Sequence, residues 1–125
     1  MNVVDSSAWL SYLAGDANAG KFSKAVEDTD LLLVPSVTLT EVFKTVFRQR
    51  DEEIALAVVA HMKQGRVVPL DAGLAIDAAS YGLAQKLPLA DSVIYATARK
   101  FDATLWTQDV DFKSLKKVRY YPKAR

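Results

Sequence analysis

Five acidic residues occupy positions at which a chain of alternating strands and helices would collect reactive groups. Asp5, Asp71 and Asp109 each follow a short apolar run, and Glu41 and Asp91 lie near the starts of two predicted helices. Carboxylates gathered in one cleft repel one another, so their pKa values rise unless a cation neutralises them. Hard divalent cations such as Mg²⁺ and Mn²⁺ prefer oxygen ligands, bind phosphate and activate water. The acids therefore indicate metal-assisted hydrolysis as one chemistry open to this chain.

Each acid also has a purely structural interpretation. Thr38 and Glu41 have the spacing of a capping box, in which a hydroxyl and a carboxylate bond reciprocal backbone amides at a helix start. Asp71 and Asp91 could be helix N-caps, and the acids of the TQDVDF segment could form a turn. Composition and spacing alone leave both interpretations open.

The residues that the chain lacks restrict the chemistry further. There is no cysteine, which excludes disulfides, zinc fingers and thiol nucleophiles. The single histidine, His61, lies on a predicted helix beside Met62, so a Ser-His-Asp triad is not expected. Neither a GxxxxGK[ST] loop nor a GxGxxG fingerprint is present. Carboxylates are the remaining chemical resource.

The composition is that of one cytoplasmic globular domain spanning residues 1–125. Half of the residues are apolar, a quarter are charged, and the net charge is +1. No apolar run approaches the roughly 18 residues needed to span a bilayer, and we identify no signal peptide. Basic residues concentrate in the segment 113–125, which holds six of them and no acid, and Lys44, Arg48 and Arg50 form a second cluster. The tail is a candidate for contacting nucleic-acid phosphate.

Strands and helices alternate along the chain. Apolar runs predict strands over residues 2–5, 31–34, 66–70, 103–107 and 118–121. Helical periodicity and breakers predict helices over 8–13, 19–27, 38–50, 52–64, 72–86 and 91–101. Such alternation predicts an α/β fold with a parallel sheet covered on both faces. Sheets of this kind bind ligands beyond the carboxyl ends of their strands, where Asp5 is expected to lie.

Four segments in this order resemble the PIN domain: VVDSSAWL, TEV at 40–42, LPLADSVIYATA and ATLWTQDVDF. The match runs from Val3 to Phe112, and the chain length is similar to that of the VapC toxin branch of the family. The resemblance implies a single three-layer PIN-like domain with a central, mostly parallel sheet of about five strands flanked by helices. It also implies that the first strand is central and beside the fourth, with the third strand at an edge.

The resemblance implies an activity and a set of site residues. The activity is Mg²⁺- or Mn²⁺-dependent endoribonuclease cleavage by metal-activated water, as the toxin of a type II toxin–antitoxin module. The catalytic and metal-binding acids of the family correspond to Asp5, Glu41, Asp91 and Asp109. Three further residues correspond to positions that orient carboxylates, contact substrate or add an acid: Ser6, Thr107 and Asp111. Asp71 matches no catalytic position and keeps its interpretation as an N-cap.

The resemblance also implies partners: an RNA substrate, a VapB-type antitoxin lying across the active-site groove, and a second copy in a homodimer, with no membrane. The candidates for an apolar partner surface are Trp9, Leu10, Leu13 and the 38–53 segment with Phe43 and Phe47. Aromatic residues at helical spacing usually pack in the core, which is the other interpretation of most of these residues. The alternative is a non-catalytic PIN-like module that binds RNA or protein. A phosphatase of the haloacid dehalogenase type is disfavoured, because it needs a second Asp two residues after the first, where this chain has Ser7.

Overall fold

The computed structural model describes residues 1–123, so Arg125 of the basic tail lies outside the described residues. Within these residues, five strands form one sheet of order β3-β2-β1-β4-β5: β1 (Asn2–Val4), β2 (Leu32–Pro35), β3 (Arg66–Val68), β4 (Thr104–Thr107) and β5 (Val118–Tyr120). All four strand pairings are parallel. The predicted central position of the first strand beside the fourth is confirmed, as is the edge position of the third.

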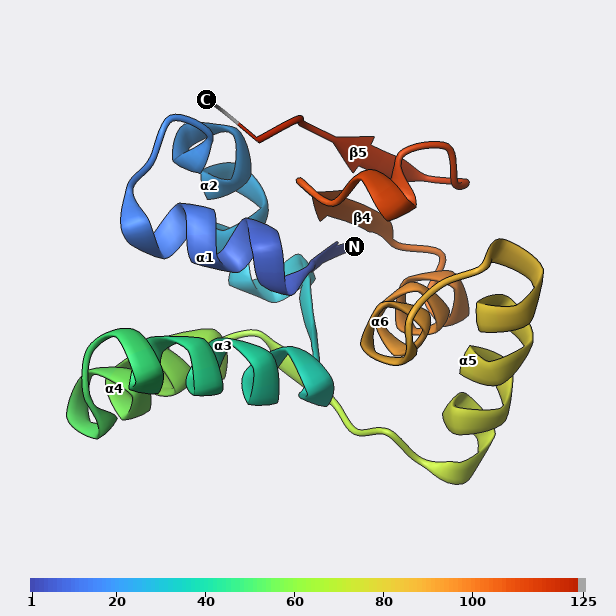
Figure 1. The fold of residues 1–125 in the computed structure, drawn as a ribbon, viewed down its shortest axis with the longest axis horizontal. Helices are drawn as coiled ribbons and strands as arrows, with labels where there is room; N and C mark the ends of the chain where they lie inside the picture. The colour runs from blue at the N-terminus through green and yellow to red at the C-terminus, as the bar shows by residue number, and fades with distance from the viewer. Residues whose placement is uncertain (124–125) are drawn as a thin grey trace.

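Helices cover both faces of the sheet and make three layers (Figure 1). Alternate side chains of a strand point to opposite faces. Val3 packs in a core with the helices α5 (Ala72–Gln85) and α6 (Leu89–Lys100). Val4 packs in the opposite core, whose helices are α1 (Ser6–Ala14), α2 (Ala19–Glu27), α3 (Ser36–Gln49) and α4 (Glu52–Met62). The predicted three-layer α/β architecture is therefore present.

Aspartates cap three α-helix starts in this fold: Asp51 accepts from the Ile54 amide (2.8 Å) at the start of α4, and Asp5 and Asp71 act in the same way. Asp5 accepts a hydrogen bond from the Ala8 amide (2.8 Å), so α1 begins at residue 6 rather than at the predicted residue 8. Asp71 accepts one from the Leu74 amide (2.8 Å) at the start of α5, which confirms its interpretation as an N-cap. Each bond satisfies one of the backbone donors that a helix start leaves unpaired.

Two other capping interpretations are wrong. Helix α3 begins directly after Pro35, and the Thr38 hydroxyl donates to the Pro35 carbonyl (2.7 Å) instead of capping the helix. Glu41 therefore lies in the second turn, and its carboxylate makes no capping box. Helix α6 begins after Pro88, which puts Asp91 in the first turn and not at the N-cap. In both places a proline precedes the helix, with its φ already fixed near the helical value.

The remaining differences are small. Short 3₁₀ helices that the periodicity did not predict cover Thr29–Leu31 and Val110–Phe112. Strand β3 stops at Val68, before a proline that has no amide hydrogen for the ladder. Among residues 1–123, no helix is long and apolar enough to cross a membrane.

Candidate active site

The carboxyl ends of β1 and β4 lie side by side at the centre of the sheet. Asp5 directly follows β1, and Asp109 follows β4 by two residues. The chain runs outward from β1 to β2 and β3 and then returns to β4 on the other side, so this is the point where strand order reverses. Open parallel sheets place their ligand sites at such a point. Asp91, at the start of α6, and Glu41, in α3, complete the acids near it.

Three carboxylates converge at this edge of the sheet. Asp91, Asp109 and Asp111 each offer one oxygen atom, and these atoms lie within 4.8 Å of one another. Asp111, the least regular position of the predicted set, is therefore a full member of the cluster. A group of carboxylate oxygens is the donor set that Mg²⁺ and Mn²⁺ prefer, so these residues fit a hard divalent cation.

The pKa of Asp91 is raised by burial and by the negative charges of nearby acids. Burial, together with the charges of four other acids, raises that pKa from 3.8 to about 7; these acids are Asp109, Asp5, Glu41 and Asp111. Within residues 1–123, the ion pairs involve Asp102 and none of these five acids. Asp91 is thus affected by the charges of the four other acids, of which Asp109 and Asp111 belong with it to the group of oxygen atoms within 4.8 Å, and no ion pair of the described residues neutralises these acids.

Asp5 is a buried acid of the site, with 2% of its surface exposed. Burial raises its pKa to about 6, although three hydrogen bonds oppose the rise. One carboxylate oxygen accepts from the Ala8 amide and the Ser7 hydroxyl (both 2.8 Å), and the other accepts from the Thr107 hydroxyl (2.5 Å). A carboxylate has roughly four acceptor positions, so about one is left for a further partner.

Ser6, the residue that follows Asp5 in the chain, holds the side chain of Glu41. The Ser6 hydroxyl donates to Glu41 Oε1 (2.6 Å), which ties the first residue of α1 to the second turn of α3. The bond fixes one oxygen of the carboxylate and leaves Oε2 for the site. Ser6 therefore orients a carboxylate, as predicted, but the carboxylate is that of Glu41 and not that of its neighbour Asp5.

A family model of the PIN domain matches residues 3–118. The chain belongs to the PIN domain family. This PIN domain has the fold of several solved structures. A toxin–antitoxin complex from Klebsiella pneumoniae contains a chain 19% identical, with a TM-score of 0.81 over 98% of this chain and 100% of that one.

Two other solved structures have the same PIN-domain fold. VapC20 from Mycobacterium tuberculosis, described as a sarcin–ricin loop cleaving toxin, is 21% identical over 94% of this chain and 97% of its own, with a TM-score of 0.76. DNA-bound VapBC from Salmonella typhimurium is 19% identical over 97% of this chain and 96% of its own, with a TM-score of 0.72. No curated protein matches the sequence. The resemblance to VapC toxins stated from the sequence is thus confirmed at the level of fold.

Sequence reasoning missed a buried polar chain behind Asp5 in this PIN domain. Ser7 accepts at its hydroxyl from the Gln108 amide, and its carbonyl accepts from the Gln108 side chain (both 3.2 Å). The side chain of Asn18 donates to Gln108 (2.6 Å) and to the carbonyl of Pro122 (2.9 Å). The signal available in the sequence was Gln108 itself, a polar residue directly after a predicted buried strand.

The basic residues of the described part of the tail, up to residue 123, do not form one patch. Lys117 pairs with Asp102 (3.1 Å) at the amino ends of β4 and β5, opposite the acids. Arg119 stacks over the Trp106 ring, with 5.0 Å between the guanidinium and the ring centroid. Lys123 instead lines a hollow beside Asp109. Lys123 is therefore a tail residue within reach of a substrate at the acidic site.

Two of the aromatic candidates for a partner surface differ. Trp9 is fully buried and packs in the core between the sheet and α1–α4, the usual place for an aromatic residue at helical spacing, so it contributes nothing to a partner surface. Phe47 is 45% exposed on α3 and packs against Phe43, with ring centroids 5.7 Å apart. Helical spacing alone could not tell a core aromatic from an exposed one.

Proposed function

We propose that this PIN domain is a divalent-metal-dependent endoribonuclease that hydrolyses RNA phosphodiester bonds, the toxin of a type II toxin–antitoxin module. The convergence of Asp91, Asp109 and Asp111 beside the buried Asp5 carries the proposal. The similar folds support it, since they include a toxin named for cleaving the sarcin–ricin loop. A toxin that cleaves cellular RNA would act in the cytoplasm.

In this proposal, different residues would bind the metal ion, position the attacking water and orient the carboxylates. Asp91, Asp109 and Asp111 would hold Mg²⁺ or Mn²⁺, with Asp5 contributing its remaining acceptor position. When bound, such an ion supplies Lewis acidity toward phosphate and lowers the pKa of water. Glu41 Oε2 would accept a hydrogen bond from the attacking water, while Ser6 keeps the carboxylate in place. Thr107 would hold Asp5 in one orientation.

Cleavage of a labelled single-stranded RNA by the purified protein tests the proposal. We expect cleavage with Mg²⁺ or Mn²⁺, none in chelator, and a loss of at least about a hundredfold in Asp91→Asn and Asp109→Asn, because both variants remove a carboxylate from the cluster. Asp30→Asn, an exposed aspartate outside the site, is the matched control and should cleave like wild type. Full activity in chelator would contradict the metal requirement, and RNA binding without cleavage would favour the non-catalytic alternative.

An antitoxin partner is part of the proposal, because two of the similar structures are described as a toxin–antitoxin complex and as VapBC. The surface that supports it surrounds Phe47 on α3. A hollow there is lined by Phe43, Phe47, Lys44 and Arg48. An antitoxin segment that presents an apolar side chain between acidic ones would match both the rings and the two cations.

A homodimer is also proposed, through the surface between α5 and α6. Leu83 and Leu89 are 86% and 83% exposed beside a hollow of about 330 Å³ whose other lining residues are mostly apolar. Asp77 is the one charged residue of α5. A twofold contact brings a surface against its own copy, so a nearly uncharged face avoids like-charge repulsion. The leucines of one copy can fill the hollow of the other.

A further inference from the structure

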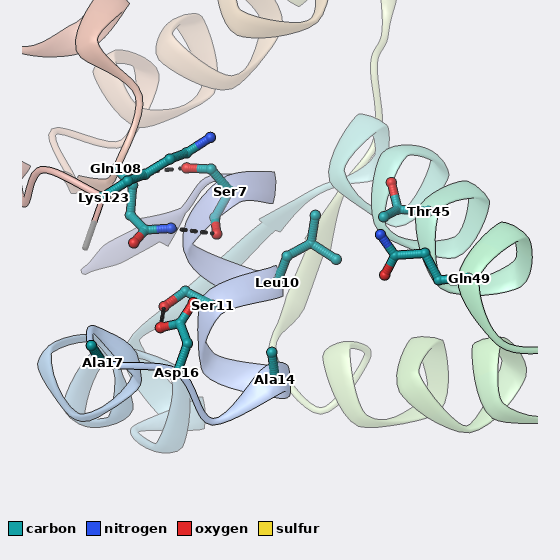
Figure 2. A pocket seen from close by; sticks show the side chains of 10 residues that line it. All are labelled: Ser7, Leu10, Ser11, Ala14, Asp16, Ala17, Thr45, Gln49, Gln108 and Lys123. Atoms are coloured by element: carbon teal, nitrogen blue, oxygen red, sulfur yellow. Dashed lines mark hydrogen bonds between the residues drawn. The ribbon is translucent and has the colours of Figure 1, made fainter. Parts of the chain in front are cut away.

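A cleft of about 550 Å³ separates α1 from α3 (Figure 2). Its volume is in the range of about 300–1,000 Å³ typical of small-molecule sites. Nothing in the proposed catalytic mechanism uses it, although one end of it reaches residues that support the acids. Its lining is mixed. The α1 side carries the apolar Leu10 and Ala14 beside two hydroxyls that already donate to carboxylates, those of Ser7 (to Asp5) and Ser11 (to Asp16).

The two walls come from residues one helical turn apart. On α1, Leu10 and Ala14 present the apolar part of one wall. On α3, Thr45 and Gln49 present a hydroxyl and an amide, and neither bonds to another residue that lines the cleft (Figure 2). Residues four apart on a helix share a face, so both walls follow directly from sequence spacing. The cleft therefore offers one face for apolar contact and one for hydrogen bonding.

The polar wall continues from the acidic site. Glu41, Thr45 and Gln49 are spaced by four residues along α3, so Thr45 lies one turn, about 6 Å, beyond Glu41 at 1.5 Å per residue. On the other side, Ser7 both bonds Asp5 and lines the cleft.

A second hollow joins the cleft to the acids. It is lined by Asp109 and shares Ser7, Gln108 and Lys123 with the cleft. A path therefore runs from the acids past Lys123 into the space between α1 and α3.

We propose that this cleft binds the base of one unpaired RNA nucleotide next to the bond that is cut. The Gln49 amide hydrogen-bonds the base edge with help from the Thr45 hydroxyl, Leu10 and Ala14 contact the base face, and Lys123 contacts a phosphate. Amide side chains carry both a donor and an acceptor, as base edges do, and unpaired bases are the part of RNA that proteins read by sequence.

The chemistry of the polar wall favours a base over an apolar peptide side chain as the occupant. An apolar side chain in the cleft would desolvate the Gln49 amide and the Thr45 hydroxyl without giving either a partner, which is unfavourable. The inference rests on the proposed ribonuclease function and extends it, because it assigns the residues that select the nucleotide at the cut site.

The test is the sequence preference of cleavage. A single-stranded RNA of randomised sequence is cut in Mg²⁺, and the product ends are sequenced. We expect wild type to prefer one or two bases at a fixed position from the cut, and Gln49→Ala to weaken that preference roughly tenfold, the size of a lost base contact. Gln85→Ala is the matched control, an exposed glutamine that ends a helix of the same length, and should keep the preference. If Gln49→Ala keeps the base preference of the wild type, the cleft does not bind the base, and the proposal is overturned in favour of a protein partner.

A binding measurement separates this proposal from the proposed function. Fluorescence anisotropy of short labelled homo-oligonucleotides is recorded with Asp91→Asn, with and without Gln49→Ala. We expect the affinity to depend on the base, and that dependence to disappear in the double variant. If the wild type binds RNA in a base-dependent way but cuts none, the proposed nuclease function is wrong and the proposal that the cleft binds a base stands. If the wild type cuts RNA but Gln49→Ala does not change the dependence of binding on the base, the nuclease function stands and the cleft proposal is wrong.

Discussion

Thr107 and Asp5 are 102 positions apart in the chain, and the hydroxyl of Thr107 donates to Asp5 Oδ2 at 2.5 Å. The same hydroxyl accepts from the Asp109 amide (2.8 Å), so it links two acids of the site. The contact exists because β1 and β4 are adjacent and parallel: the Asp5 amide continues their pairing by donating to the Trp106 carbonyl (3.1 Å). Thr107 therefore sets the position of Asp5 relative to Asp109.

Replacing Thr107 by valine should impair cleavage more than its effect on folding explains. The variant keeps the shape of the side chain but leaves Asp5 and the Asp109 amide each without one partner, so we expect a loss of about 1–3 kcal/mol in stability and about 10–100-fold in activity. Thr97→Val is the control, since the buried Thr97 hydroxyl bonds the Val93 carbonyl (2.8 Å) away from the acids. Equal activity losses in the two variants would contradict a positioning role for Thr107.

The stability of the metal-free protein should fall as pH rises from about 4 to 7. The pKa values of Asp5 and Asp91 are raised in the folded protein, to about 6 and about 7, from the ordinary value of 3.8. Across this window the folded state holds protons that the unfolded chain has lost, so raising the pH favours unfolding. Urea unfolding in chelator at a series of pH values measures this slope, and stability that rises across the window would contradict the pKa shifts.

The Asp91→Asn variant should show a smaller slope. At pH 8 without metal it should be more stable than wild type by on the order of 1 kcal/mol, after allowing for solvent screening of a half-buried carboxyl. At pH 3 the two proteins should be nearly equal, because Asp91 is then largely protonated in both the folded and the unfolded state. A variant that is less stable than wild type at pH 8 would mean that the Asp91 carboxylate supports the fold.

Mg²⁺ should stabilise the wild-type protein against heat. An ion that binds only the folded state adds about 2.7 kcal/mol at a concentration 100 times its Kd. The increase in Tm should be lost largely in Asp109→Asn, which removes one of the three clustered carboxylates. Thermal unfolding monitored by circular dichroism over a Mg²⁺ titration measures both shifts, and identical shifts would place the ion elsewhere.

Gly82 should be intolerant of alanine because α5 and α6 approach closely there. An added Cβ would lie 2.6 Å from Ser92 Oγ, which is held by the Pro88 carbonyl (2.8 Å). We expect Gly82→Ala to destabilise the protein by about 1–3 kcal/mol through overpacking. Gly20→Ala on α2, where an added Cβ meets nothing within 4 Å, should stabilise by about 0.5–1 kcal/mol. Urea unfolding of both variants checks the difference in sign.

Leu83→Glu should convert the proposed dimer to a monomer. The charge would face its own copy across the twofold contact and would enter an apolar hollow, both unfavourable. Light scattering after size-exclusion chromatography measures the mass in solution. Leu56→Glu on α4, at a leucine 54% exposed outside that surface, is the control and should remain dimeric. A wild type that is monomeric at high micromolar concentration would refute the dimer.

Local patterns and motifs were enough to predict the strands and α-helices and to propose most of the acids of the candidate site. Apolar runs and helical periodicity predicted each strand and α-helix to within a few residues, because the repeating pattern of buried side chains is visible over a short stretch of chain, whereas the two short 3₁₀ helices were missed. Asp71 was identified as an N-cap for the same reason, since its partner is only three residues away. Asp5, Glu41, Asp91 and Asp109 were identified by the resemblance of their segments to the PIN domain.

Contacts between side chains far apart in the chain could not be predicted before the three-dimensional fold was known. The Asp109 carboxylate accepts a hydrogen bond from the Asp111 amide, as expected of a turn residue. Both acids also belong to the cluster with Asp91, so they have a structural role and a role in the candidate site at once. Ser6 supports Glu41 and Thr107 supports Asp5, pairings that no local pattern contains. Distances between residues far apart in sequence depend on strand order and register, and these are set only when the parallel sheet forms.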